Sequence, residues 1–217
     1  MDPDARTREL ANRAIAAGDP TAWFEELYEA ASRGDAVVPW DRDEPHSLLA
    51  SWPAPAGDGR RALVVGAGLG RDAEHLAGLG YSVVAFDISP TAVESARRRH
   101  PGSPVRYVTA DLLSPPASWS GAFDLVVESM TVQALPDPPR GAAIAQVGRF
   151  VAPGGTLLVI AAGRDPDMEF DGPPWPLTRD EVSTFAVGDL VTTRVEELRD
   201  RDPIFGWRAE FTRPPSH

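Results

Sequence analysis

The sequence contains neither cysteine nor lysine. The absence of cysteine excludes disulfides, thiolate nucleophiles, iron–sulfur clusters and cysteine-rich zinc sites. The absence of lysine excludes Schiff-base catalysis and the P-loop lysine. All 21 basic residues are therefore arginines, and 32 acidic residues outnumber them to give a formal net charge of −11. Because binding to nucleic-acid phosphates needs clustered cations, we expect no nucleic-acid partner.

Long apolar runs are absent as well, and none approaches the roughly 20 residues of a membrane span. We therefore expect a cytoplasmic protein with no membrane partner. The four histidines are scattered along the chain, so we expect no metal site. A length of 217 residues is enough for one domain with a core of its own. The oligomeric state stays open between a monomer and a homodimer.

Composition divides the chain into two parts. Residues 5–33 have the apolar spacing of two helices, interrupted at Gly18-Asp19-Pro20. Residues 35–59 form a connection rich in proline, tryptophan and aspartate. We therefore expect an N-terminal helical extension over residues 1–59 and a main domain over residues 60–217.

The main domain alternates strands with helices. The apolar runs that predict its first five strands are residues 62–65, 82–87, 105–108, 123–127 and 156–160. This alternation predicts an α/β fold, with a parallel sheet and helices on both of its faces. A proline-rich stretch at 163–176 is long enough to be a lid. Thr178 and Glu181 form a capping box that restarts a short helix. Two last strands, near 190–198 and 206–212, are expected to pair antiparallel at the sheet edge.

The sharpest motif is a glycine turn, Gly66-Ala-Gly68-Leu-Gly70, between the first strand and the helix that follows it. Glycine lets the backbone turn tightly and approach a ligand closely. Asp87 lies 21 positions after Gly66, at the end of the second strand. A carboxylate at that place can accept both hydroxyls of a ribose. The combination predicts a nucleoside ligand.

The spacing of the glycines favours one kind of nucleoside. A dinucleotide fingerprint reads G-x-G-x-x-G, whereas the sixth position here is Arg71. A ligand with a ribose and no pyrophosphate fits better, although an NAD-dependent oxidoreductase and a non-catalytic nucleoside-binding or sensor protein remain alternatives. After the third strand, Asp111 can hold an adenine amino group while Leu112 packs on the ring. Taken singly, Asp111 is equally a turn residue.

From about residue 61 to 162 these motifs resemble the class I S-adenosylmethionine-dependent methyltransferases. The resemblance also includes Phe123-Asp-Leu-Val-Val-Glu128 and Ala152-Pro-Gly-Gly-Thr156. It implies a Rossmann-like seven-stranded, mostly parallel sheet of order 3-2-1-4-5-7-6 with the seventh strand antiparallel. It implies S-adenosyl-L-methionine as the cofactor and S-adenosyl-L-homocysteine as the product. The cofactor-binding residues that it implies are Trp40, Gly66, Gly68, Gly70, Asp87, Ile88, Asp111, Leu112 and Glu128.

A narrower resemblance is to the thiopurine and small-thiol or halide methyltransferase branch. The motifs that carry it are Gly70-Arg-Asp72, Phe86-Asp-Ile-Ser89, Ala134-Leu-Pro-Asp-Pro-Pro-Arg140 and Gly172-Pro-Pro-Trp-Pro176. It implies that the N-terminal extension is a lid whose aromatic residues cover the cofactor. The acceptor that we expect is a small molecule carrying a thiol, a soft anion or an aromatic hydroxyl. The expected substrate-binding residues are Trp23, Tyr28, Arg140 and Trp175.

Methyl transfer from a sulfonium is an in-line displacement whose leaving group already carries the positive charge. The protein's main task is therefore to align the acceptor with the methyl group and the sulfur. The reaction does not require a strong base, so the sequence assigns no catalytic residue. The two candidates for a catalytic role are His46 and Arg140. Arg140 is expected in the first turn of a helix, where a cation is unfavourable. We therefore expect its guanidinium either to contact an anionic substrate or to form an ion pair with Asp137. Helical spacing would equally place Trp23 in the core.

Overall fold

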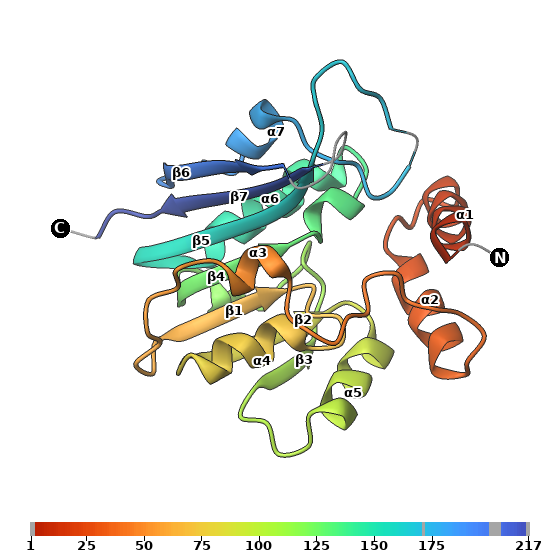
Figure 1. The fold of residues 1–217 in the computed structure, drawn as a ribbon, viewed down its shortest axis with the longest axis horizontal. Coiled ribbons are helices and arrows are strands. Elements are labelled where there is room, and N and C mark those ends of the chain that lie inside the picture. The colour runs from red at the N-terminus through yellow and green to blue at the C-terminus, as the bar shows by residue number, and fades with distance from the viewer. Residues whose placement is uncertain (1–2, 171, 200–204, 216–217) are drawn as a thin grey trace.

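The computed structural model describes residues 3–170, 172–199 and 205–215, and its centre is a seven-stranded sheet of order β3-β2-β1-β4-β5-β7-β6 (Figure 1). The strands are β1 Arg61–Val65, β2 Ser82–Asp87, β3 Arg106–Thr109, β4 Phe123–Ser129, β5 Val151–Gly163, β6 Val191–Leu198 and β7 Phe205–Thr212. Strand β7 pairs antiparallel with both β5 and β6, and the other neighbours are parallel. The predicted fold class and strand order are confirmed.

Seven α-helices and two short 3-10 helices accompany the sheet in the described ranges. They are α1 Pro3–Ala16, α2 Ala22–Ser32, α3 Ser47–Ala50, α4 Arg71–Gly78, α5 Pro90–Arg99, α6 Pro139–Phe150, α7 Arg179–Ser183, η1 Ala117–Trp119 and η2 Val132–Ala134. The two N-terminal helices lie beyond the edge of the sheet where the parallel strands end (Figure 1). None of the helices in the part of the chain that the structure describes is long and apolar enough to cross a bilayer.

Both faces of the sheet are buried because successive side chains of a strand point to opposite faces. In β1, Leu63 and Val65 join the cluster under α6 and α7, which includes Val147 and Val182. Ala62 and Val64 join the cluster under α3, α4 and α5. A strand buried on both faces has a continuous apolar sequence rather than an alternating one. This explains why residues 62–65 of β1 are all apolar.

Strand β5 is longer than predicted. It covers 13 residues, Val151–Gly163, whereas the apolar run predicts only 156–160. Its first part contains the turn-forming residues 153–155 and shifts register against β4 between Phe123 and Leu125. Its last part has small residues but pairs with β7 as far as Gly163 and Phe205. Pairing with a neighbour therefore extends the strand where its own sequence gives no strand signal.

The two last strands form the antiparallel pair that the sequence predicts. Their connection and residue 171 of the proline-rich stretch lie partly or wholly outside the described residues. The capping box that restarts the chain before them is formed. The Thr178 hydroxyl accepts the Glu181 N–H at 3.3 Å, and the Glu181 carboxylate accepts the Thr178 N–H at 2.6 Å. The capping box thereby gives acceptors to the Thr178 and Glu181 N–H groups, which have no carbonyl partner within the helix.

Replacing the cap residue tests this account of α7. We expect Thr178→Ala to lower the free energy of unfolding by about 1 kcal/mol, because the Glu181 N–H loses its acceptor. The control is Ser183→Ala, which removes an exposed hydroxyl of the same helix that bonds only to the Arg179 carbonyl. Urea unfolding of both variants measures the difference. Equal losses in the two variants would contradict the capping account.

Candidate functional site

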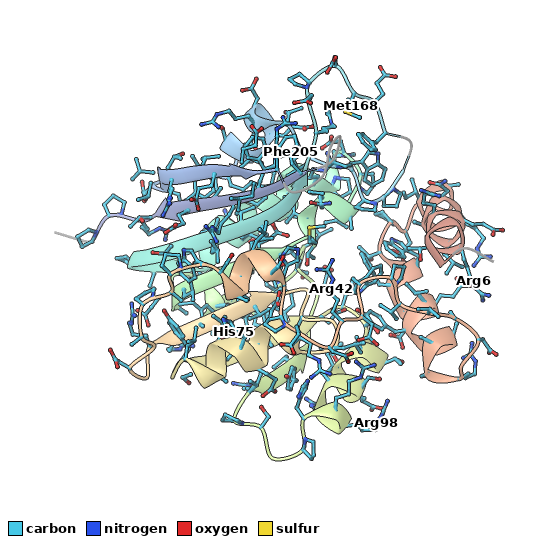
Figure 2. All side chains as sticks on the ribbon, viewed as in Figure 1. Arg6, Arg42, His75, Arg98, Met168 and Phe205 are labelled. Atoms are coloured by element: carbon cyan, nitrogen blue, oxygen red, sulfur yellow. The ribbon has the colours of Figure 1, made fainter. Side chains whose placement is uncertain are left out.

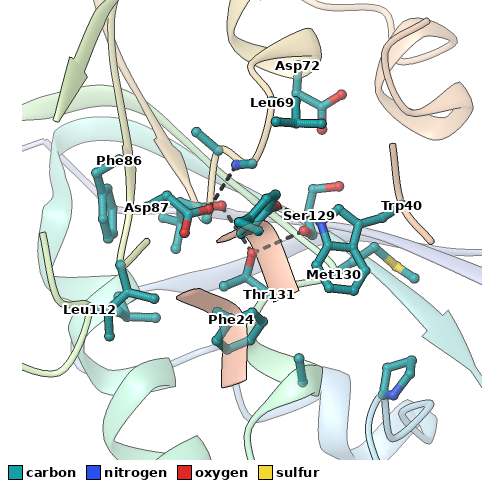
Figure 3. Close-up of a pocket in the computed structure, with 18 of the residues that line it drawn as sticks. Phe24, Trp40, Leu69, Asp72, Phe86, Asp87, Leu112, Ser129, Met130 and Thr131 are labelled. Carbon is teal, nitrogen blue, oxygen red and sulfur yellow. Dashed lines mark hydrogen bonds between the residues drawn. The ribbon is translucent and has the colours of Figure 1, made fainter. Parts of the chain in front are cut away.

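A cavity of about 420 Å³ opens where the carboxyl ends of β1, β2 and β4 meet (Figure 3). Open α/β sheets bind ligands at this edge, and the volume lies in the range of about 300–1,000 Å³ that is usual for small-molecule sites. Its floor comes from the strand ends and the glycine turn. Its other walls come from α1, α2, residues 39–46 and the two prolines at 173–174.

The glycine turn forms the floor in a conformation that needs glycine. Gly66, Gly68 and Gly70 have φ angles of 61°, 50° and 94°, all in the left-handed region. A Cβ on Gly66 would lie 2.1 Å from Thr131 Oγ1, and one on Gly70 would lie 2.4 Å from the Tyr107 hydroxyl. Glycine is therefore required at the first and last of these positions for two reasons, the left-handed backbone of the turn and the close packing of Thr131 and Tyr107 against it.

Asp87 is joined to this turn by a hydrogen bond. Its Oδ2 accepts the Gly68 N–H at 2.9 Å (Figure 3). Its Oδ1 accepts the Ser89 N–H at 3.0 Å. Burial raises the pKa of Asp87, while the N–H groups of Ser89, Gly68 and Ile88 oppose that rise. A carboxylate has about four acceptor positions, so these contacts leave capacity for a ligand hydroxyl. The acid and the turn that the sequence predicted as a pair therefore form one unit of the cavity.

The remaining residues predicted from the second and third strands also line the cavity. Ile88 follows Asp87, and Asp111 and Leu112 approach from the end of β3. Asp111 lines the cavity, and its Oδ1 accepts the Leu113 N–H at 2.8 Å. The turn role is therefore formed, and the contact with an adenine amino group stays a prediction. Leu112 is 7% exposed and presents an apolar surface on this side.

An aromatic group from the N-terminal extension lies over the glycine turn. Trp40 Nε1 donates a hydrogen bond to the Tyr28 hydroxyl at 2.7 Å. That hydroxyl would lie only 3.0 Å from a Cβ on Gly68. Trp23 meets Trp40 edge to face with ring centroids 5.9 Å apart, and it also packs into the core of the helical pair. Phe24 completes the group and lines the cavity, although the sequence analysis did not include it.

His46 lines the cavity, but its ring is already engaged. Its Nδ1 accepts the Leu48 N–H at 3.2 Å and so caps α3. Its backbone N–H donates to Asp72 Oδ1 at 2.8 Å. Burial lowers the pKa of His46, which favours the neutral ring with its proton on Nε2. The nitrogen that has a free electron pair is therefore the one that holds the helix cap.

Arg140 and Trp175 lie together but outside the cavity lining. The Arg140 guanidinium carbon is 5.3 Å from the centroid of the Trp175 ring. Arg140 Nε donates to the Leu135 carbonyl at 2.9 Å, and its Nη1 lies 3.8 Å from Asp137 Oδ2. The structure thus forms the pairing with Asp137 that was the alternative to a substrate contact, though at a long distance.

Glu128 also differs from its expected position at the ligand. It is 1% exposed, and its Oε1 accepts the N–H groups of Thr131 and Val132, both at 2.8 Å. These bonds hold the turn that leads from β4 into η2. Burial raises the pKa of Glu128 to about 7. Among the described residues, the part of the cavity lining that comes from the end of β4 begins at Ser129, the last residue of the strand, rather than at Glu128.

Several lining residues were missed by the sequence analysis. Met130 has a φ of 63°, one of two non-glycine residues with positive φ in the described ranges. Such strained residues concentrate at functional sites. The signal that could have found it is its place directly after β4. Thr7 and Arg8 carry no motif, and only the fold brings them to the cavity. Pro173 and Pro174 belong to the Gly172–Pro176 motif, but the sequence analysis did not name them as site residues. Within the described ranges, no group of three or more acidic or histidine side chains is placed to hold a metal ion.

Comparison with known proteins finds methyltransferases. Residues 62–155 match a family model described as a methyltransferase domain. An uncharacterized methyltransferase of Mycobacterium tuberculosis is 31% identical over 122 residues, which cover 56% of this chain and 60% of that protein. A probable thiol methyltransferase 2 of Arabidopsis thaliana is 28% identical over 181 residues, covering 81% and 75% respectively. The chain therefore aligns with less than two thirds of the mycobacterial relative.

Solved structures show the same fold. The N-methyltransferase NodS from Bradyrhizobium japonicum, in complex with S-adenosyl-L-homocysteine, superimposes with a TM-score of 0.64 at 20% identity. The alignment covers 87% of this chain and 98% of that one. At this identity the likeness establishes the fold. Together with the family match, it confirms the resemblance to the class I methyltransferases.

The buried carboxyl of Glu128 gives the protein a pH-dependent stability. Between pH 4.5 and 7 the folded state keeps a proton that the unfolded state has released, so stability falls as pH rises through this window. Glu128→Gln keeps the acceptor oxygen for the two N–H groups and cannot ionise. We expect this variant to lack that fall and to gain on the order of 3 kcal/mol over the unmodified protein at pH 8.

Chemical unfolding at several pH values measures the effect. The matched control is Glu94→Gln, which neutralises an exposed carboxyl on α5 and should leave the pH profile as it is. A profile for Glu128→Gln that still falls between pH 4.5 and 7 would show that another group controls it.

Proposed function

We propose that this chain, whose residues 62–155 belong to the methyltransferase domain family, is an S-adenosyl-L-methionine-dependent methyltransferase acting on a small-molecule acceptor. One observation supports the proposal more than any other. The glycine turn and the Asp87 carboxylate are hydrogen-bonded to each other at the floor of a cavity large enough for a nucleoside. The family match and the solved neighbours agree with this reading.

The residues present suit the cofactor from one end of the cavity to the other. Asp87 keeps acceptor capacity for a ribose hydroxyl. Asp111 and Leu112 offer an acceptor for an adenine amino group and an apolar surface for its ring. Because the turn consists of glycines, its backbone can come close to the methionine portion of the ligand. Trp40, from the N-terminal extension, covers the cavity. When bound, S-adenosyl-L-methionine supplies a methyl group on a positively charged sulfur.

The protein's own contribution is alignment and the exclusion of water. With the cofactor bound, the acceptor's electron pair would form the new bond to the methyl carbon as the carbon–sulfur bond breaks, which would release S-adenosyl-L-homocysteine as a neutral thioether. Phe24, Met130, Leu135 and the two prolines at 173–174 contribute apolar side chains to the cavity wall. An apolar wall favours a soft or weakly solvated acceptor atom. Because His46 Nδ1 is engaged in capping α3, we assign no general base.

We propose that the acceptor carries a thiol, a soft anion or an aromatic hydroxyl. Such groups ionise readily and react without a strong base, which suits a cavity where the structure offers none. The probable thiol methyltransferase from Arabidopsis supports this class, since it aligns with 81% of the chain. The domain division at residue 60 belongs to the same proposal, with the first 59 residues acting as the lid.

Cofactor binding is the direct test. Calorimetric titration of the purified protein with S-adenosyl-L-homocysteine should show micromolar binding, and titration with NAD should show none. We expect Asp87→Ala to weaken the first by about 100-fold, because hydrogen bonding to a charged acceptor is lost. Asp189→Ala, an exposed substitution far from the cavity lining, is the control. Binding of NAD alone would overturn the proposal in favour of an oxidoreductase.

A second test asks which arginine meets an anionic acceptor. Arg8 lines the cavity from α1, and no ion-pair partner for it exists among the described residues, whereas Arg140 is engaged with Leu135 and Trp175. We therefore expect Arg8→Gln to raise KM about tenfold for a carboxylate-bearing aromatic thiol and not for thiophenol. Arg140→Gln should change neither value. The reverse pattern would restore Arg140 to the substrate side.

A further inference from the structure

Helix α2 of the N-terminal extension lies beside helix α5 (Figure 1). Carboxylates of the extension bond to residues at both ends of α5. At the start of α5, Glu25 accepts hydrogen bonds from the Ser89 hydroxyl and, at 2.7 Å, from the Thr91 hydroxyl. At its end, the two carboxylate oxygens of Asp41 accept from Arg99 Nη1 at 2.6 Å and Nη2 at 2.7 Å. The first contact fixes α2 and the second fixes the segment that follows it.

The two contacts differ in what they can do. Glu25 lies at the positive end of the helix dipole and is partly buried, so it docks α2 as a whole. The Asp41–Arg99 pair has two parallel hydrogen bonds, a geometry that fixes orientation. Their side chains are 33% and 38% exposed, and ion pairs at such exposure contribute little to global stability. The second contact therefore acts mainly on the local position of its segment.

Asp41 is next to Trp40, and this connects the ion pair to the cavity. Trp40 bonds through Nε1 to the Tyr28 hydroxyl, which lies over Gly68. Trp40 is 37% exposed, so its ring is supported on one side and open on the other. On the far side of Asp41, the Arg42 carbonyl accepts from Arg71 Nε at 3.1 Å. The ring is thus held over the glycine turn by anchors on its flanking backbone.

We propose that the Asp41–Arg99 ion pair positions Trp40 over the cavity, so that Arg99 is a positioning residue for cofactor binding although it does not line that cavity. This inference rests on the proposed function, since it takes the ligand under Trp40 to be the methyl donor or its product. Breaking the pair frees the segment that carries Trp40, and the ligand loses part of its cover. The loss falls on cofactor affinity and on its rate of dissociation.

The test measures binding of S-adenosyl-L-homocysteine by calorimetry. We expect Arg99→Gln and Asp41→Asn each to raise Kd about tenfold, within the range of coupling between contacting residues. Arg99→Lys should recover part of the affinity, because it restores the charge without the two-pronged geometry. The melting temperature should fall by no more than a few degrees.

The neighbouring Arg98 provides a matched control. It lies on the same turn of α5 (Figure 2). Its guanidinium bonds to Glu94 and Ser95 within that helix. Arg98→Gln should leave Kd unchanged. A second comparison uses Trp40→Leu, which should raise Kd as the ion-pair variants do. Adding Arg99→Gln to Trp40→Leu should then cause no further loss, because both changes remove the same cover.

The outcomes separate this inference from the function on which it rests. If the unmodified protein fails to bind S-adenosyl-L-homocysteine, the proposed function is overturned and the inference falls with it. If it binds and Arg99→Gln binds equally well, the proposed function stands and the inference is overturned. An undiminished effect of Arg99→Gln in the Trp40→Leu background would also overturn it, because the ion pair would then act by another route.

Discussion

The hydrogen bond from the Gly68 N–H to the Asp87 carboxylate is the interaction on which the site depends. It can form only if β1 and β2 run parallel and end side by side, which their register from Arg61 to Val65 provides. It also needs a left-handed backbone at Gly68, so that the N–H points along the sheet edge. The pairing of β1 with β2, the conformation of the glycine turn and the position of Asp87 therefore depend on one another. Together they form the floor of the cavity.

The part of the site that this constraint creates is the part that could be predicted from the sequence. A strand, a glycine turn and an acid at the next strand end are local patterns whose mutual position is set by parallel pairing, so Asp87 and Leu112 could be assigned without coordinates. The strand order followed from the resemblance to a known family. The full length of β5 could not be read, because its ends depend on partners in β4 and β7 rather than on its own composition.

Side-chain direction explains the remaining differences. Glu128 is the last residue but one of β4, near the ligand-binding edge, yet its carboxylate accepts the Thr131 and Val132 N–H groups. Arg140 has the right residue type in a fitting motif, but it bonds to the carbonyl of Leu135, the residue that follows η2. Sequence position predicts which edge a residue reaches. It does not predict whether the side chain will hydrogen-bond to nearby backbone groups instead of to a ligand.

The two halves of the cavity are thus held by different kinds of force. Its floor lies within residues 62–155, which match the family, and is fixed by backbone pairing in a sheet buried on both faces. Its cover comes from residues outside that match, such as Trp40, and is fixed by a few contacts within the extension and with α4 and α5. Backbone pairing tolerates little change, whereas single polar contacts can be replaced. A fold of this kind can keep one donor site while its cover is adapted to different acceptors.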